Sequence, residues 1–235
     1  MLNQYKWRHF YFNKYIVSCL PKKKYFISYD YHHKALWFRV FKAGSRSIDC
    51  HLKNESVQGA YIYSSEVGYI PFMFRHYFKF AFVRNPETRF ISAWKDKVLN
   101  QNYFRFSEEK HERMKELDNF IEWVKTLDIQ RCDEHLREQC SLIDLNHIDF
   151  LGRLEFFERD FNYLADKIGL RRDNPIHLNK TNKNTDLHLS YRQKREIQNI
   201  YKRDFEILYP QYNTSLVHEE LTPPPNDLSP VVLVN

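Results

Sequence analysis

Two segments of the chain share one order of features: an apolar run, a polar turn and the start of a helix. The first run spans 35–40 and its turn begins at residue 41; the second spans 78–83 and its turn begins at residue 84. Neither run alternates apolar and polar residues, which is typical of strands buried on both faces of a parallel sheet. We therefore predict an α/β fold, with a central, mostly parallel sheet flanked by helices.

Helical patterns follow the second run and continue downstream. Pro86 and Glu87 are good start signals, and they predict a helix over 87–98. Apolar spacing predicts further helices at about 118–127, 155–168 and 190–208, and a short strand at 147–151. The three prolines at 223–225 cannot continue a helix. We divide the chain into an N-terminal extension (1–30), one domain (31–212) and a C-terminal tail (213–235).

Glycine is scarce, and this excludes the common phosphate-binding fingerprints. The chain has 5 glycines among 235 residues, and no two of them can build the G-x-G-x-x-G dinucleotide motif. The pair of glycines five positions apart that a Walker A loop needs is also absent. If the protein binds a phosphorylated ligand, another type of loop holds it.

Charge and cysteine usage limit the class of partner and the compartment. The net charge of +6 suits an anionic partner, but the basic residues are scattered rather than clustered. The 4 cysteines form no C-x-x-C pair, which favours a reducing compartment. No stretch approaches the length of a membrane span. We expect a cytoplasmic protein without a transmembrane segment; peripheral membrane contact and the oligomeric state are left open.

The first turn (41–47) has the composition of an anion-binding loop. Lys42 brings a mobile positive charge, Gly44 allows close approach, and Ser45 and Ser47 lead into a helix whose N-terminal N–H groups attract anions. The alternative is a helix capped by Ser45 with an exposed lysine beside it.

The second turn (84–92) repeats the pattern. Arg84 and Ser92 are eight positions apart, so a guanidinium on the loop and a hydroxyl two turns into the helix could converge on one anion. The alternative is a surface ion pair of Arg84 or Arg89 with Glu87 or Asp96. Two such turns on adjacent parallel strands would hold a ligand with phosphate groups at both ends.

These two turns resemble the nucleotide loops of sulfotransferases that use 3′-phosphoadenosine 5′-phosphosulfate. Residues 41–47 (FKAGSRS) are similar to the 5′-phosphosulfate loop, and residues 82–94 (FVRNPETRFISAW) to the 3′-phosphate loop. The resemblance implies a nucleotide site like that of P-loop kinases. It assigns the 5′ end of the cofactor to Phe41, Lys42, Ala43, Gly44, Ser45, Arg46 and Ser47, and the 3′-phosphate to Arg84 and Ser92.

The resemblance extends downstream and is closest to the carbohydrate sulfotransferases of the chondroitin, dermatan and HNK-1 branch. Segments 133–140 (DEHLREQC), 149–155 (DFLGRLE) and 178–182 (LNKTN) follow in the order of that family. It implies that Lys180 and Thr181 close over the nucleotide. The chain departs from the family pattern at Phe41, Arg46, Leu136 and Glu138, and the missing anchor and stem favour a soluble member of bacterial or viral type.

The implied reaction moves a sulfuryl group from the phosphosulfate to a hydroxyl of a carbohydrate or other acceptor, without a metal. A lysine ammonium stabilises charge on the leaving group, which gives Lys42 that role. A general base must take the proton of the acceptor, and His135 is our first choice. The other candidates are His51, His76, Glu66 and Asp96.

Three alternatives remain at this point. Cys132, His135, Cys140 and His147 are residue types that bind zinc, although their spacing matches no common zinc finger, and a Cys132–Cys140 disulfide is disfavoured in a reducing compartment. A nucleotide kinase or NTPase on a related fold is opposed by the missing P-loop glycine. A nucleic-acid-binding protein would need a clustered basic face; we expect no nucleic-acid partner.

Overall fold

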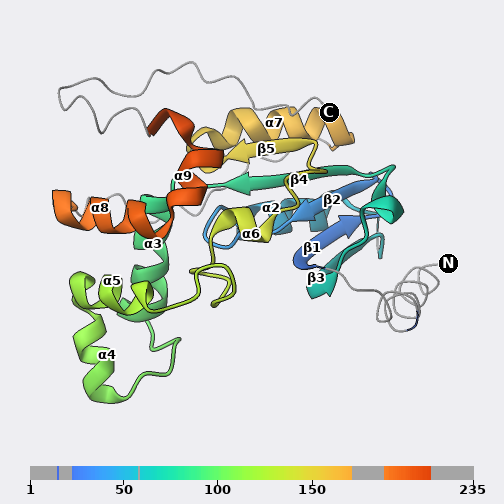
Figure 1. Cartoon of the computed structure of the whole chain (residues 1–235). Coiled ribbons are helices and arrows are strands. Elements are labelled where there is room, and N and C mark those ends of the chain that lie inside the picture. Colours follow the sequence, from blue (N-terminus) through green and yellow to red (C-terminus); the bar gives the residue numbers. More distant parts are fainter. Residues whose placement is uncertain (1–14, 16–22, 58, 171–187, 213–235) are drawn as a thin grey trace.

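The computed structural model describes residues 15, 23–57, 59–170 and 188–212. Its strands form one five-stranded sheet with the order β3-β1-β2-β4-β5 (Figure 1). The strands are β1 (Lys24–Asp30), β2 (Ala35–Phe38), β3 (Tyr61–Gly68), β4 (Phe78–Val83) and β5 (Phe150–Arg153).

The sheet is parallel at β2, β4 and β5, and antiparallel at one side. Strand β4 pairs in parallel with both β2 and β5, whereas β1 is antiparallel to both β2 and β3. The predicted α/β class is confirmed, with a mixed sheet. Strand β1 lies within the segment that we assigned to the N-terminal extension, yet its Ile27 is opposite Phe38 of β2. A domain boundary at residue 31 would separate two paired strands, so residues 24–30 belong to the sheet.

Helices cover both faces of the sheet and extend beyond one end of it. The α-helices are α2 (Ser45–Glu55), α3 (Pro86–Trp94), α4 (Glu108–Met114), α5 (Leu117–Lys125), α6 (Gln139–Leu142), α7 (Phe157–Ile168), α8 (Tyr191–Ile200) and α9 (Lys202–Leu208). Short helical turns are η3 (Pro71–Phe74), the π-helical η4 (Lys95–Leu99), η5 (Leu154–Phe156) and η6 (Pro210–Tyr212).

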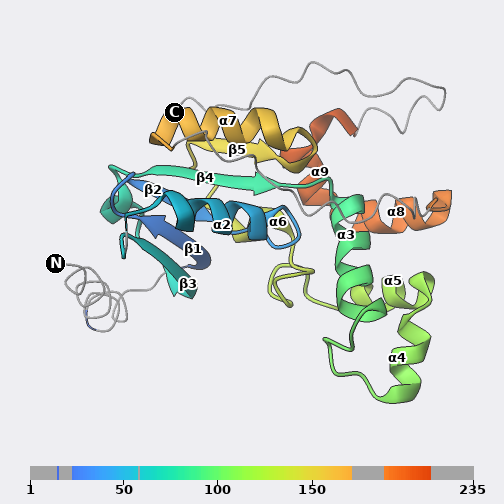
Figure 2. The same ribbon diagram turned by 180° about the vertical axis from the view of Figure 1, so that it is seen from behind.

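Two apolar clusters pack on opposite faces of the sheet, because successive side chains of a strand point to opposite sides. On one face, Trp37 of β2 and Phe80 of β4 pack with apolar residues of α2 and α7. On the other face, Phe38 and Ala81 pack with residues of α3, α5, α8 and α9. Figures 1 and 2 show α2 and α6 on opposite sides of the sheet. Both faces of the central strands are therefore buried, as their unbroken apolar runs predict.

The predicted helices form, with one interruption. Gly169, at φ 72°, ends α7, and Ser190 with Gln193 makes the capping box that begins α8. The helix predicted over 190–208 is divided into α8 and α9 at Tyr201, whose buried hydroxyl donates to the carbonyl of Leu136 at 2.7 Å.

The carboxyl ends of the parallel strands meet at one edge of the sheet. Beyond this edge α3, α4, α5 and α8 gather at the left in Figure 1. In the part of the chain that the structure describes, no helix is long and apolar enough to cross a membrane. The C-terminal tail and residues 171–187 lie outside the described residues.

Candidate active site

The first turn leaves β2 in a conformation that favours glycine. Gly44 is the N-cap of α2 and has φ 81°, in the left-handed region. A Cβ at this position would lie 2.9 Å from Cδ1 of Leu154, so the leucine side chain would have to shift. Lys42 has φ 67°, a conformation that is uncommon for a residue with a side chain. No side chain caps α2, so the predicted alternative of a Ser45 cap is not found.

The ammonium of Lys42 lies 3.0 Å from Oδ2 of Asp96 in the π-helical turn η4. Burial lowers the pKa of Lys42, while the hydrogen bond and charge of Asp96 act in the opposite direction. For Asp96, burial acts to raise the pKa, but Lys42 and Lys97 hold it below its usual range. Lys42 is thus a charged, largely desolvated group at the head of the first turn.

The second turn contacts the first directly. The Arg84 guanidinium donates from Nε to Oγ1 of Thr88 at 3.0 Å, and its NH1 group lies 3.4 Å from the carbonyl oxygen of Lys42. Ser92 is one helical turn beyond Thr88, on the same side of α3. Desolvation on burial lowers the pKa of the Arg84 guanidinium. The two predicted anion-binding turns are therefore adjacent, with their cationic residues at the same edge of the sheet.

Three side chains bind the backbone of the second turn. Gln139 accepts from the N–H of Arg84 at 2.9 Å and donates to its carbonyl at 2.8 Å. The Asn85 side chain caps α3 by accepting from the N–H groups of Glu87 and Thr88, and Glu155 accepts from the N–H of Asn85 at 2.7 Å. This network fixes the backbone of Arg84.

Arg89 connects the first turn to the segment that contains His135. Its side chain is 1% exposed and donates to the carbonyls of Phe41 at 2.9 Å and Glu134 at 3.2 Å. The alternative of a surface ion pair is therefore wrong for Arg89, since its guanidinium is buried and bonded to backbone carbonyls.

His135 lies against the first turn. Its Nδ1 is 2.9 Å from Oδ1 of Asp133, and its ring packs edge-on against Phe41 and Tyr103, with both centroid distances at 5.0 Å. Burial acts to raise the pKa of Asp133, but its bonds to His135 and Tyr103 hold it below its usual range. An ionised Asp133 favours the Nδ1–H tautomer of His135, which leaves Nε2 as the nitrogen that can accept a proton.

The other candidate bases have different surroundings. His51 of α2 is buried, with its ring against Phe161, so it belongs to the core. His76 precedes β4, at the opposite end of that strand from the second turn. Glu66 is paired with Arg137 at 2.8 Å. Of these candidates, only Asp96 shares with His135 a contact to the first turn.

Of the remaining predicted residues, Ala43 is buried, Ser45 and Ser47 are half-buried and Arg46 is exposed. Lys180 and Thr181 lie outside the described residues.

The zinc alternative finds no support in the arrangement of its residues. Among the described residues, the group of potential metal ligands that comes together is Asp133, Glu134 and His135, and neither Cys132 nor Cys140 is part of it. Burial raises the pKa of Cys132 to about 11, and it also raises that of Cys140.

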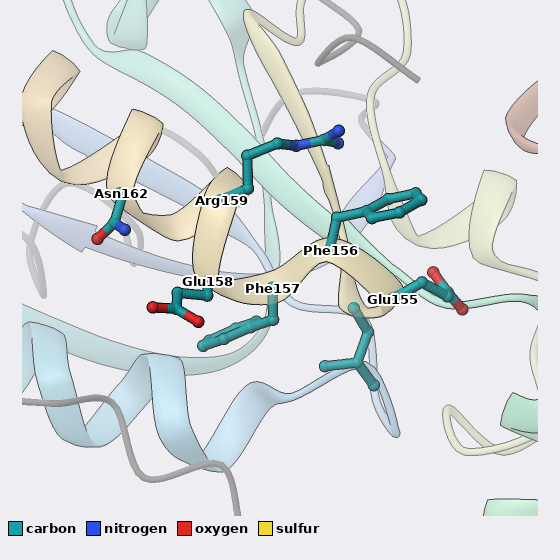
Figure 3. A pocket seen from close by; sticks show the side chains of 7 residues that line it. Glu155, Phe156, Phe157, Glu158, Arg159 and Asn162 are labelled. Carbon is teal, nitrogen blue, oxygen red and sulfur yellow. The ribbon is translucent and has the colours of Figure 1, made fainter. Parts of the chain in front are cut away.

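A surface hollow lies behind the two turns, at the start of α7. Figure 3 shows its lining side chains, which come from Leu154, Glu155, Phe156, Phe157, Glu158, Arg159 and Asn162. None of them belongs to the predicted nucleotide turns. Its charged side chains are the carboxylates of Glu155 and Glu158 and the guanidinium of Arg159. The edge formed by the two turns, which carries Lys42 and Arg84, is our candidate for the nucleotide.

Comparison with known proteins adds an independent finding. The model of the sulfotransferase family matches residues 25–210, which is most of the chain. The chain belongs to this family. Carbohydrate sulfotransferase 14 of Danio rerio is 30% identical over 117 residues, which cover 40% of this chain and 31% of that protein. The chain thus spans less than a third of that relative in the match. No solved structure matches the chain.

Membership of the sulfotransferase family confirms the resemblance stated above and disfavours the kinase, NTPase and nucleic-acid alternatives. The match begins at residue 25, so it includes nearly all of β1. Several residues of the site were not predicted: Asp96 as partner of Lys42, Asp133 as partner of His135, and Gln139 as support of Arg84. The Lys42–Asp96 and Arg84–Gln139 contacts join residues more than fifty positions apart, so no local sequence pattern could indicate them. Asp133 and His135 are only two positions apart.

Proposed function

We propose that this chain transfers the sulfuryl group of 3′-phosphoadenosine 5′-phosphosulfate to a hydroxyl group of a carbohydrate. The contact between the two turns carries the proposal. Arg84 at the 3′-phosphate loop reaches the backbone of Lys42 in the 5′-phosphosulfate loop, as one nucleotide bound at both ends requires. Family membership supports the nucleotide, and the name of the related Danio rerio protein supports a carbohydrate acceptor.

The residues present fit such a nucleotide. Lys42 and the N-terminus of α2 would hold the 5′ end, while Arg84 and Ser92 would hold the 3′-phosphate. Arg84 is largely desolvated, and its side chain donates hydrogen bonds to a hydroxyl and a carbonyl rather than to a carboxylate. A guanidinium in that setting gains from an anionic partner.

Two side chains have roles in the transfer. When bound, the nucleotide supplies a sulfuryl group on a phosphate leaving group. Lys42 stabilises the negative charge that develops on the leaving oxygen. His135 accepts the acceptor hydroxyl proton at Nε2, and the Asp133 carboxylate stabilises the imidazolium that results. No residue in this scheme needs a metal ion.

A thermal-shift panel followed by an activity assay tests the proposal. 3′-Phosphoadenosine 5′-phosphate at about one hundred times its Kd should stabilise the chain by about 2.7 kcal/mol, whereas ATP with Mg²⁺ should not. Labelled phosphosulfate should then transfer its label to at least one glycan in a panel of acceptor classes. Stabilisation by ATP with Mg²⁺ alone would contradict the proposal, and an oligonucleotide serves as the polyanion control.

A further inference from the structure

One carboxylate oxygen in the site is shared by two lysines. Oδ2 of Asp96 lies 3.0 Å from the ammonium of Lys42 and 3.4 Å from that of Lys97. Lys42 comes from the first turn, whereas Asp96 and Lys97 are neighbours in η4. Two positive charges from separate elements therefore meet around a single negative charge.

The surroundings keep this cluster in place. The Lys97 ammonium also lies over the ring of Tyr103, 4.2 Å from the centroid, a cation–π contact. Its side chain is 10% exposed and that of Lys42 is 18% exposed, so water screens neither charge fully. The π-helical turn places Asp96 and Lys97 here, and such turns occur often at functional sites.

An anionic ligand at the first turn would compete with this carboxylate. The Lys42 ammonium can be satisfied by Asp96 or by a phosphate, and a phosphate near Asp96 is repelled by it. Lys97 opposes this competition, because it attracts the same carboxylate oxygen away from Lys42. Lys42 and Lys97 therefore compete for the carboxylate of Asp96.

We propose that Asp96 and Lys97 are positioning residues that set how strongly the first turn binds its anion. Asp96 holds the Lys42 ammonium and weakens nucleotide binding, and Lys97 acts through Asp96 by sharing its carboxylate. This inference rests on the proposed function, since it needs a nucleotide phosphate at the first turn. It replaces the base role considered for Asp96, because a carboxylate bonded to two ammonium groups is a poor proton acceptor.

Calorimetric titration with 3′-phosphoadenosine 5′-phosphate tests the inference on the full chain. Asp96→Asn should bind this nucleotide about three- to tenfold more tightly than wild type, and Lys97→Met about three- to tenfold more weakly. In the double variant, removal of Lys97 should change affinity by less than about twofold relative to Asp96→Asn, because Lys97 acts through the acid.

Two exposed sites give matched controls for net charge. Glu112→Gln changes the charge as Asp96→Asn does, and Lys202→Met changes it as Lys97→Met does. The side chains of Glu112 and Lys202 are 68% and 76% exposed. Both controls should bind the nucleotide as wild type does. If Asp96→Asn is unstable, Asp96→Ser should show the same gain in affinity, which loss of structure would not produce.

The outcomes separate this inference from the proposed function. If wild type binds the nucleotide but Asp96→Asn and Asp96→Ser bind it equally or more weakly, the inference is overturned and the proposed function stands. The inference is also overturned if Lys97→Met weakens nucleotide binding in the Asp96→Asn background as much as it does in wild type. If wild type does not bind the nucleotide at all, the proposed function fails and this inference fails with it.

Discussion

The first turn and the second turn lie side by side, but different forces hold their cationic side chains. Lys42 of the first turn is held by an ion pair with Asp96. Arg84 of the second turn makes its hydrogen bonds to uncharged groups: Gln139 binds its backbone, and its side chain contacts Thr88 and a carbonyl. The Glu155 carboxylate favours the charged form of Arg84 without a hydrogen bond to it. The first arrangement can exchange one anion for another, and the second presents a fixed guanidinium.

This difference suits two ends of a nucleotide with different tasks. At the reacting end, charge develops during transfer, so an ammonium that can change partner is useful. At the anchoring end, the phosphate does not react, and a preorganised guanidinium loses little freedom on binding. His135, which packs against Phe41, belongs with the first turn. The following predictions ask whether the two ends separate in this way.

The largest effect is expected at His135. His135→Ala should lower turnover by about 10²–10⁴-fold and remove the acidic limb of the pH–rate profile, because the proton acceptor is lost. Nucleotide affinity and melting temperature should change little. If His135 only supports the wall of the site, the variant would instead lose about 0.5–3 kcal/mol of stability and keep the acidic limb. Melting curves and pH–rate profiles on this variant distinguish the two roles.

Lys42→Ala should lower both kcat and kcat/KM by about 10²–10³-fold, because its ammonium acts mainly on the charge of the transition state. Affinity for 3′-phosphoadenosine 5′-phosphate should fall much less than turnover. Steady-state kinetics and calorimetry on the same preparation measure both quantities. Near-normal turnover would mean that Lys42 does not stabilise the leaving group.

Arg84→Ala should show the opposite separation, with affinity affected more than the chemical step. Loss of a charge-assisted hydrogen bond costs about 1.5–3 kcal/mol, which corresponds to about 10–150-fold in Kd. Ser92→Ala removes a neutral hydroxyl and should cost about 0.5–1.5 kcal/mol. Adenosine 5′-phosphate is the control ligand, and its affinity should be the same in both variants as in wild type.

The smallest effect is a dependence of stability on pH at the first turn. Burial acts to raise the pKa of Asp96, but its lysine partners hold it below the reference value of 3.8. A carboxyl group with a lowered pKa stabilises the fold above that value, and this contribution disappears as the pH falls through the pKa of the folded state. Asp96→Asn should therefore lower stability by about 0.5–1 kcal/mol at neutral pH and by nothing at strongly acidic pH.

A variant of Gln139, which supports the second turn, provides the contrast. Gln139→Leu removes two uncharged hydrogen bonds to the backbone of Arg84, so its loss of stability should be similar at neutral and acidic pH. Thermal unfolding of both variants at several pH values makes the comparison. A strong pH dependence in Gln139→Leu, or none in Asp96→Asn, would mean that the two turns are not held by different forces.

Sequence reasoning succeeded where the structure is local. The strand 78–83, the strand-to-helix turns and the capping box at Ser190 depend on neighbouring residues, and all are present as predicted. It failed for β1 and β3, which pair antiparallel at the side of the sheet. Strand β3 is mostly exposed or half-buried, and its partner β1 lies more than thirty positions earlier, so no continuous apolar run marks β3 as a strand.

The candidate site divides in the same way. The residues of the two turns could be proposed from the sequence because each turn is a contiguous motif. The pairing of Lys42 with Asp96 and the support of Arg84 by Gln139 depend on how distant segments pack. Tyr201, where the last helix is divided, also makes a contact to a remote residue, since its hydroxyl donates to the carbonyl of Leu136.

The central claim is that the two turns hold one nucleotide that carries phosphate groups at both ends. Calorimetric titration of the wild-type chain with 3′-phosphoadenosine 5′-phosphate and with adenosine 5′-phosphate tests it most directly. We predict that the nucleotide with the 3′-phosphate binds about 10–150-fold more tightly, because the second turn supplies a charge-assisted hydrogen bond to that group. Equal affinity for the two nucleotides would contradict the account, since Arg84 would then make no contact with a 3′-phosphate.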